Sequence, residues 1–153
     1  RRRDTEIEHT YLLRPGRWRA EGTYYDDAGR AFPLTGRSEL IQDGPERRLT
    51  GWMEVAGPQP LRFANHYTIR ETDRPCTLAW QSVNPALGVL EGTFELAGES
   101  ILSRYVSPDR VYSGCEVLTL QGGGRYYNAG VSMKHGRRMS AWTAILREER
   151  GPD

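Results

Sequence analysis

Cysteine and lysine are scarce in this sequence, and long apolar runs are missing. The 153 residues include two cysteines, Cys76 and Cys115, and their spacing fits neither a set of zinc ligands nor a disulfide framework. No apolar run approaches the ~20 residues that a membrane-spanning helix needs, and no signal peptide is visible. We therefore expect a cytoplasmic protein that does not cross a membrane.

The charge balance argues against several functions. Lys134 is the single lysine, and 21 Lys+Arg against 20 Asp+Glu leave a net charge of +1, without the basic field of a nucleic-acid-binding protein. His9, His66 and His135 show no metal-ligand spacing, and no Ser or Cys stands in a nucleophile elbow. The Gly122–Gly124 run predicts a hairpin turn and not a phosphate loop, because no helical pattern follows it. We expect no metal, no cofactor and no nucleic-acid partner.

Turn residues recur about every ten positions and separate runs of alternating apolar and polar residues. Typical turns are Asp26–Gly29, Asp43–Pro45 and Ser107–Asp109. No stretch shows the apolar spacing of an amphipathic helix. The pattern predicts strands at about 16–25, 30–42, 47–56, 61–71, 76–83, 88–97, 100–106, 110–121, 124–134 and 137–148.

Ten strands joined by short links must each run antiparallel to the strand before. Such a meander leaves two exposed edges unless it closes on itself. The sequence therefore predicts an all-β protein with one up-and-down barrel of about ten strands and a central cavity. We assign residues 14–150 to the barrel and residues 1–13 to an N-terminal extension that forms a short helix or a plug.

Opposed residues of paired antiparallel strands share a face, so the inward face of one strand predicts that of the next. Trp18 and Tyr24 set the inward face of the first strand, because the other face carries charges. The resulting interior is mostly apolar but includes several polar side chains. Such a mixture suits a cavity that holds water and a small ligand better than a dry core. The predicted ligand-binding residues are Tyr24, Ser38, Met53, Phe63, Asn65, Tyr67, Trp80, Ser82, Phe94, Arg104, Tyr112, Glu116, Tyr127, Met133 and Trp142.

Gly16, Arg17 and Trp18, at the start of the first predicted strand, resemble the G-x-W motif of the calycins, which include lipocalins, fatty-acid-binding proteins and nitrobindin-like barrels. The resemblance implies a barrel in which Trp18 closes one end against a basic side chain of the last strand, here Arg147. Ten strands are closer to the fatty-acid-binding and nitrobindin-like barrels than to eight-stranded lipocalins. Nitrobindin-like barrels bind haem through a His of the last strand, and residues 140–146 contain none, so haem is not expected.

Arg104, Glu116 and Tyr67 are the candidates for chemistry. Arg104 on an inward face would bind a carboxylate or enolate oxygen by charge-assisted hydrogen bonds. Glu116 against an apolar wall would have a raised pKa and act as a general acid or base. The alternatives are a structural ion pair of these two residues, a register error, or tyrosines that only fill the barrel.

These observations support three hypotheses. In the first, the barrel binds a small, mostly apolar or aromatic molecule. In the second, it is a cofactor-free cyclase, isomerase or lyase of secondary metabolism that acts on such a molecule with Glu116, Arg104 and Tyr67. In the third, a filled barrel serves as a protein-interaction module. A homodimer is compatible with each.

Overall fold

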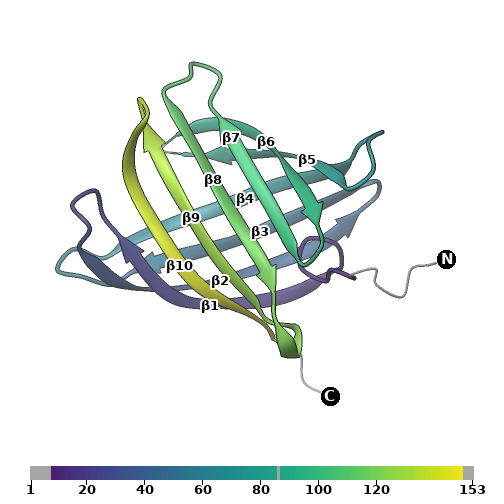
Figure 1. Ribbon diagram of the computed structural model, residues 1–153, viewed down its shortest axis with the longest axis horizontal. Helices are drawn as coiled ribbons and strands as arrows, with labels where there is room; N and C mark the ends of the chain where they lie inside the picture. Colours follow the sequence, from purple (N-terminus) through teal and green to yellow (C-terminus); the bar gives the residue numbers. More distant parts are fainter. Residues whose placement is uncertain (1–7, 86, 150–153) are drawn as a thin grey trace.

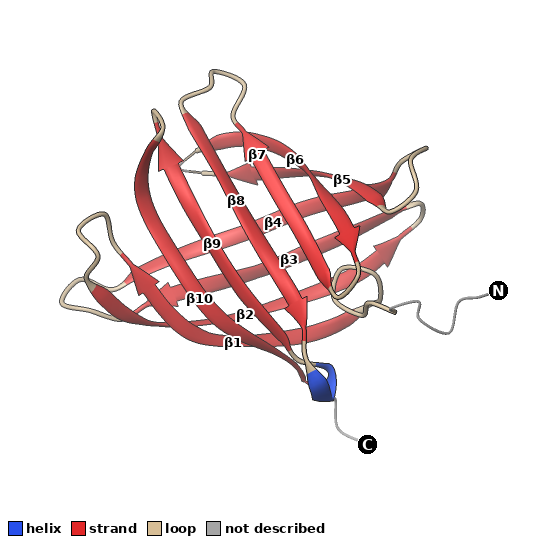
Figure 2. Ribbon diagram, in the orientation of Figure 1, coloured by secondary structure: helices blue, strands red, loops and turns tan. Residues whose placement is uncertain are grey.

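Turn residues divide the chain into ten strands, as the sequence predicts. The computed structural model describes residues 8–85 and 87–149. Each strand boundary lies within two residues of its predicted position, and one short 3-10 turn, η1 (Gly122–Gly124), stands between the eighth and ninth strands (Figure 2). The strands are β1 (Gly16–Tyr25), β2 (Ala31–Asp43), β3 (Glu46–Val55), β4 (Leu61–Glu71), β5 (Thr77–Asn84), β6 (Gly88–Ala97), β7 (Ser100–Val106), β8 (Tyr112–Leu120), β9 (Tyr126–Lys134) and β10 (Arg137–Glu149).

The sheet closes on itself through the first and last strands. Each strand pairs with its neighbours in sequence, and β1 also pairs antiparallel with β10, from Arg17 opposite Glu149 to Tyr25 opposite Ala141 (Figure 1). The predicted up-and-down barrel of ten strands is thus confirmed. No helix among the described residues is long and apolar enough to span a membrane.

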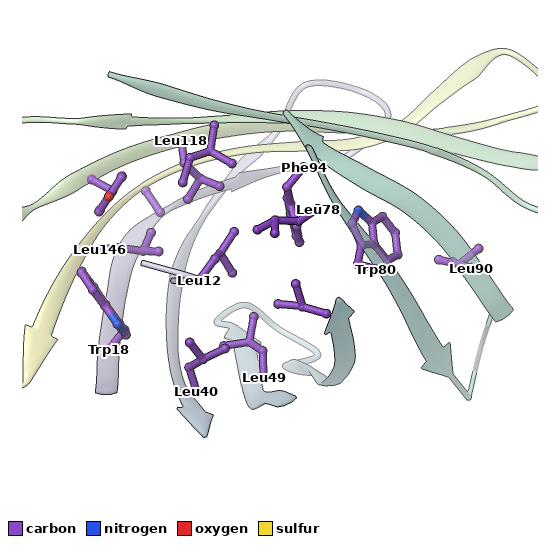
Figure 3. Close-up of a cluster of buried hydrophobic side chains, with 14 of the residues drawn as sticks. Leu12, Trp18, Leu40, Leu49, Leu78, Trp80, Leu90, Phe94, Leu118 and Leu146 are labelled. Carbon is purple, nitrogen blue, oxygen red and sulfur yellow. The ribbon is translucent and has the colours of Figure 1, made fainter. Parts of the chain in front are cut away.

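The two ends of the barrel differ in packing. The closed end, where β1 begins and β10 ends, holds Trp18, Ile69 and Ile101, each at most 1% exposed. Figure 3 shows Leu12, from the segment before β1, among the large apolar side chains that line this end. The open end, where β1 ends and β10 begins, leaves the inward-facing Leu61 and Phe63 47% and 37% exposed.

Residues 8–15 form a turn across the closed end and not a helix. The buried ring of His9 bonds through Nδ1 to the Tyr126 hydroxyl at 2.8 Å, and through Nε2 to the carbonyl oxygen of Gly98 at 2.9 Å. The backbone N–H of Thr10 also donates to the Tyr126 hydroxyl, at 3.2 Å. These bonds attach the segment to the β6–β7 turn and to β9. The attachment keeps Leu12 inside the closed end of the barrel. Residues 1–7 of the predicted extension lie outside the described residues.

Aromatic side chains, and not an arginine, cover Trp18. The rings of Tyr11 and Tyr126 pack edge-on against it, with centroids 5.1 and 5.8 Å away. Arg147, the basic partner that the calycin resemblance implies, is exposed on the outer face, because it stands one residue out of phase with the inward-facing Leu146. That part of the expectation is wrong.

The predicted inward faces are correct for β1 to β6, β8 and β10, and wrong for β7 and β9. The β6–β7 hairpin pairs Ala97 with Ser100, which places Ile101, and not Leu102, on the same face as Leu96. One residue of slippage turns a strand over, which places Arg104 on the outside. The register of β9 also differs by one residue from the prediction, so its predicted inward residues face outward. A bulge between Arg138 and Ser140 shifts the register again, so β10 has its predicted inward face. The inward residues are Ile101, Ser103 and Tyr105 on β7, and Tyr126, Asn128, Gly130 and Ser132 on β9.

Three large rings lie flat against the barrel wall because each stands opposite a glycine. The pairs are Trp80 with Gly92, Tyr105 with Gly114, and Trp142 with Gly130. A Cβ added to any of these glycines would come within 2.3–2.6 Å of the facing ring. The missing side chains therefore let the rings cover the strands and leave the barrel axis open.

Candidate functional site

The barrel encloses a cavity of about 470 Å³ that extends from the packed closed end toward the open end. This volume lies within the usual range for small-molecule pockets, which is roughly 300–1,000 Å³. The lining includes ten of the predicted ligand-binding residues. They are Tyr24, Ser38, Met53, Phe63, Asn65, Tyr67, Trp80, Phe94, Glu116 and Trp142.

Five predicted residues do not line the cavity. Ser82 is buried and faces inward beside the cavity wall, and Tyr112 lies under the ammonium group of Lys134, 5.8 Å from its ring centroid. Arg104, Tyr127 and Met133 lie on the outer face, because β7 and β9 are turned over relative to the prediction. The predicted inward positions of these three residues are therefore wrong.

Aromatic side chains form one side of the cavity. Trp80 packs against Tyr67 and Tyr105 with ring centroids 5.1 and 6.0 Å apart, and against Phe94 at 6.0 Å. The indole Nε1 of Trp80 donates to the Ser103 hydroxyl at 3.1 Å. Because the indole N–H already has an acceptor, Trp80 offers a ligand its ring face and not its donor.

A hydrogen-bonded chain of side chains crosses the adjoining part of the wall from β10 to β8. Trp142 Nε1 donates to Asn128 Oδ1 at 2.9 Å, and Asn128 Nδ2 donates to Glu116 Oε2 at 2.9 Å. Asn128 Nδ2 also donates to the carbonyl oxygen of Val117 at 3.1 Å. Since an indole nitrogen can only donate, Trp142 fixes the amide of Asn128 with its NH₂ group toward Glu116. Among the described residues, Asn128 is the only side chain that donates a hydrogen bond to Glu116.

Glu116 dominates the electrostatics of the cavity. Burial in the barrel interior raises the pKa of its carboxyl group, and the hydrogen bond from Asn128 offsets part of that effect. Burial also raises the pKa of the Tyr11 and Tyr67 hydroxyls above their usual range, and the nearby charge of Glu116 adds to it. The pKa of Tyr105 is raised for the same two reasons, partly offset by a hydrogen bond with Ser132. Three protonated phenols therefore surround one carboxyl group.

No cationic side chain balances this carboxyl group within the described cavity wall. Arg19 and Arg37 belong to wall strands but are exposed on the outer face, and Arg37 Nη1 lies 3.3 Å from Glu149 Oε2. Arg104, the predicted anion-binding residue, is exposed to solvent. The described residues also contain no group of three or more His, Cys, Asp and Glu side chains that could hold a metal ion.

Sequence reasoning missed several polar groups of the cavity. Tyr105, Ser103, Asn128 and Ser132 come from the two turned-over strands, and Tyr11 comes from the segment before the barrel. The glycines opposite Tyr105 and Trp142 are a signal that could have corrected the register, since large rings often stand opposite strand glycines. No comparable signal marks Tyr11, because its place depends on long-range hydrogen bonds of His9 and Thr10.

Comparisons with known proteins bear on the fold. No protein-family model and no curated protein sequence matches this chain. The S-type phycobiliprotein lyase CPES from Guillardia theta superimposes with a TM-score of 0.64 over 90% of this chain and 89% of its own, at 8% sequence identity. Rv2717c from M. tuberculosis superimposes with a TM-score of 0.64 over 88% of this chain and 92% of its own, at 16% identity. At these identities the likeness shows the fold alone, which in this chain is a closed antiparallel β-barrel of ten strands.

Proposed function

We propose that this protein binds a small, mostly apolar or aromatic molecule inside the barrel. The observation that supports the proposal is the cavity of about 470 Å³ lined by aromatic and apolar side chains. A barrel evolved only for stability would fill such a space, because each unfilled volume of methyl size costs about 1 kcal/mol. The exposed inward faces of Leu61 and Phe63 supply an apolar entrance at the open end.

A cavity-filling variant tests this proposal. Met53→Trp enlarges a side chain of the cavity wall, and Val83→Trp introduces the same residue on the outer face, where Val83 is 58% exposed. We expect the wild type and Val83→Trp to bind members of a panel of lipophilic compounds, measured by native mass spectrometry and thermal shift. Met53→Trp should lose most of this binding. A wild-type barrel that carries no ligand after purification and shows no thermal shift with the whole panel would contradict the proposal.

The alternative is a cofactor-free cyclase, isomerase or lyase that acts on such a molecule in the same cavity. Its support is the position of Glu116, a carboxyl group with a raised pKa, near the hydroxyl of Tyr67. Such a pair suits general acid or base catalysis. Arg104 has no part in this proposal, since it lies outside. If Glu116→Gln and Tyr67→Phe both retained full turnover of a verified substrate, the two residues would have no catalytic role.

A further inference from the structure

The charge of the cavity restricts the kind of molecule that it can hold. Glu116 is the one carboxylic acid among the described lining residues, and its carboxyl group accepts a hydrogen bond through Oε2 from Asn128. Oε1 has no hydrogen-bond donor among the described residues. Oε1 is not fully buried, so it is open to the cavity, where a ligand that donates a hydrogen bond can reach it.

The side chains around Glu116 cannot supply a counter-charge. Tyr11 from the N-terminal turn, Tyr67 from β4 and Tyr105 from β7 are the titratable groups that face it, and all three are neutral phenols. The cavity-wall arginines Arg19 and Arg37 point to solvent. A ligand carboxylate in this cavity would meet a second acid and no cation, which is unfavourable at low dielectric constant.

We infer that the cavity selects apolar or aromatic molecules that carry a hydrogen-bond-donating nitrogen, above all a protonated amine, and rejects fatty acids and other carboxylates. The nitrogen lies against Oε1 of Glu116, and the apolar part of the molecule lies on the rings of Trp80 and Trp142. This inference rests on the proposed binding function and reverses the preference that an inward Arg104 would give.

The chain of hydrogen bonds from Trp142 through Asn128 to Glu116 fixes which polar groups face a ligand. Asn128 uses its Oδ1 for Trp142 and its Nδ2 for Glu116 and Val117, so the amide cannot turn to donate to a ligand carboxylate. Trp142 is held in place because its ring fills the space above Gly130, where a Cβ would come within 2.3 Å of the ring. Toward the cavity this chain of hydrogen bonds therefore presents Oε1 of Glu116 and no amide donor of Asn128.

Three probes that share one ring system test the inference. The probes are 2-(1-naphthyl)ethylamine, 2-(1-naphthyl)ethanol and the anion of 1-naphthylacetic acid, whose head groups are cationic, neutral and anionic. Isothermal titration calorimetry at neutral pH measures their affinities. The wild type should bind the amine about tenfold or more above the carboxylate, in line with a charge-assisted hydrogen bond. Glu116→Gln should reduce amine affinity about tenfold and raise carboxylate affinity. Glu21→Gln, which removes the same charge from the exposed outer face of β1, should change neither.

The outcomes separate this inference from the proposed function. Equal affinity of the wild type for all three probes, or a preference that persists in Glu116→Gln, overturns the amine selectivity and leaves cavity binding intact. Failure of all three probes to bind, while members of the lipophilic panel do bind, overturns the amine selectivity alone, and failure of the panel as well overturns both.

A second measurement avoids the variant, in case Glu116→Gln does not fold as judged by circular dichroism. The affinity of the wild type for naphthylethylamine should fall as the pH is lowered and Glu116 takes up a proton, while the affinity for naphthylethanol stays constant. The phenols of Tyr11, Tyr67 and Tyr105 stay protonated throughout this range, because burial raises their pKa values. An amine affinity that does not change with pH contradicts the inference.

Discussion

The closed end and the open end of this barrel use similar residues for different purposes. At the closed end, Trp18 is 1% exposed, and the turn that carries Leu12 packs beside it. At the open end, Phe63 faces the same interior but is 37% exposed and stacks on Tyr24, with ring centroids 6.4 Å apart. One end therefore forms a packed core, and the other leaves apolar side chains exposed at the mouth of the cavity. The difference teaches that inward orientation alone does not make a residue part of a core.

Truncation of one aromatic residue at each end should give the largest contrast. Trp18→Ala leaves a large void in a packed region, so we expect a loss of about 3–5 kcal/mol in the free energy of unfolding. Phe63→Ala removes a side chain already open to solvent and should cost about 1 kcal/mol or less. Urea denaturation measures both. Equal losses at the two positions would contradict the division into a closed and an open end.

The hydrogen bonds of Tyr126 should give an intermediate effect. Tyr126→Phe keeps the ring but leaves the Nδ1 atom of His9 and the backbone N–H of Thr10 without their partner. We expect a loss of about 1–3 kcal/mol, the usual cost of an unsatisfied buried polar group. The control is Tyr127→Phe on the outer face, which should leave thermal and urea unfolding unchanged. If the two variants unfold alike, the segment before β1 does not stabilise the closed end.

Glu116 should give the smallest effect, and one that depends on pH. Because burial raises the pKa of this carboxyl group above its ordinary 4.5, the folded protein holds the proton more tightly than the unfolded chain does. The group therefore stabilises the fold below about pH 4.5, and this contribution is lost as the pH rises through the folded-state pKa. Glu116→Gln should be more stable than the wild type at neutral pH, and the difference should vanish in acid. Urea unfolding of both proteins across this pH range tests it, and a difference that does not change with pH would contradict it.

Local signals were enough to predict most of the fold. Gly, Pro, Asn and Asp at the turns placed all ten strands, since these residues adopt backbone conformations that others avoid. The faces of β1 to β6 followed from charged residues such as Arg17, Arg19 and Glu21, which must point to solvent. The prediction was wrong where both faces carry apolar residues, because then hydrophobicity does not identify the buried face. On β7, Leu102 and Val106 are 44% and 46% exposed, and they misled the register.

That single slip had a large effect on the predicted site. It placed Arg104 inside and left Ser103 and Tyr105 out, while the similar slip on β9 left out Asn128. The inward position of Glu116 was predicted correctly, because β8 has the expected face although β7 does not. The charge of a cavity depends on a few residues, so it is far more sensitive to register than the fold is.

The glycines opposite the rings also bear on the width of the cavity. Gly114 lies under the Tyr105 ring, and a Cβ there would come within 2.6 Å of it. Replacement of Gly114 by alanine would force the ring away from the wall and into the space that a ligand needs. Gly92 and Gly130 stand in the same relation to Trp80 and Trp142. A Cβ at Gly92 would also come within 2.4 Å of the carbonyl oxygen of Arg104. At Gly114 and Gly130, the absence of a side chain therefore sets how close the facing ring lies to the wall, and with it the width of the cavity.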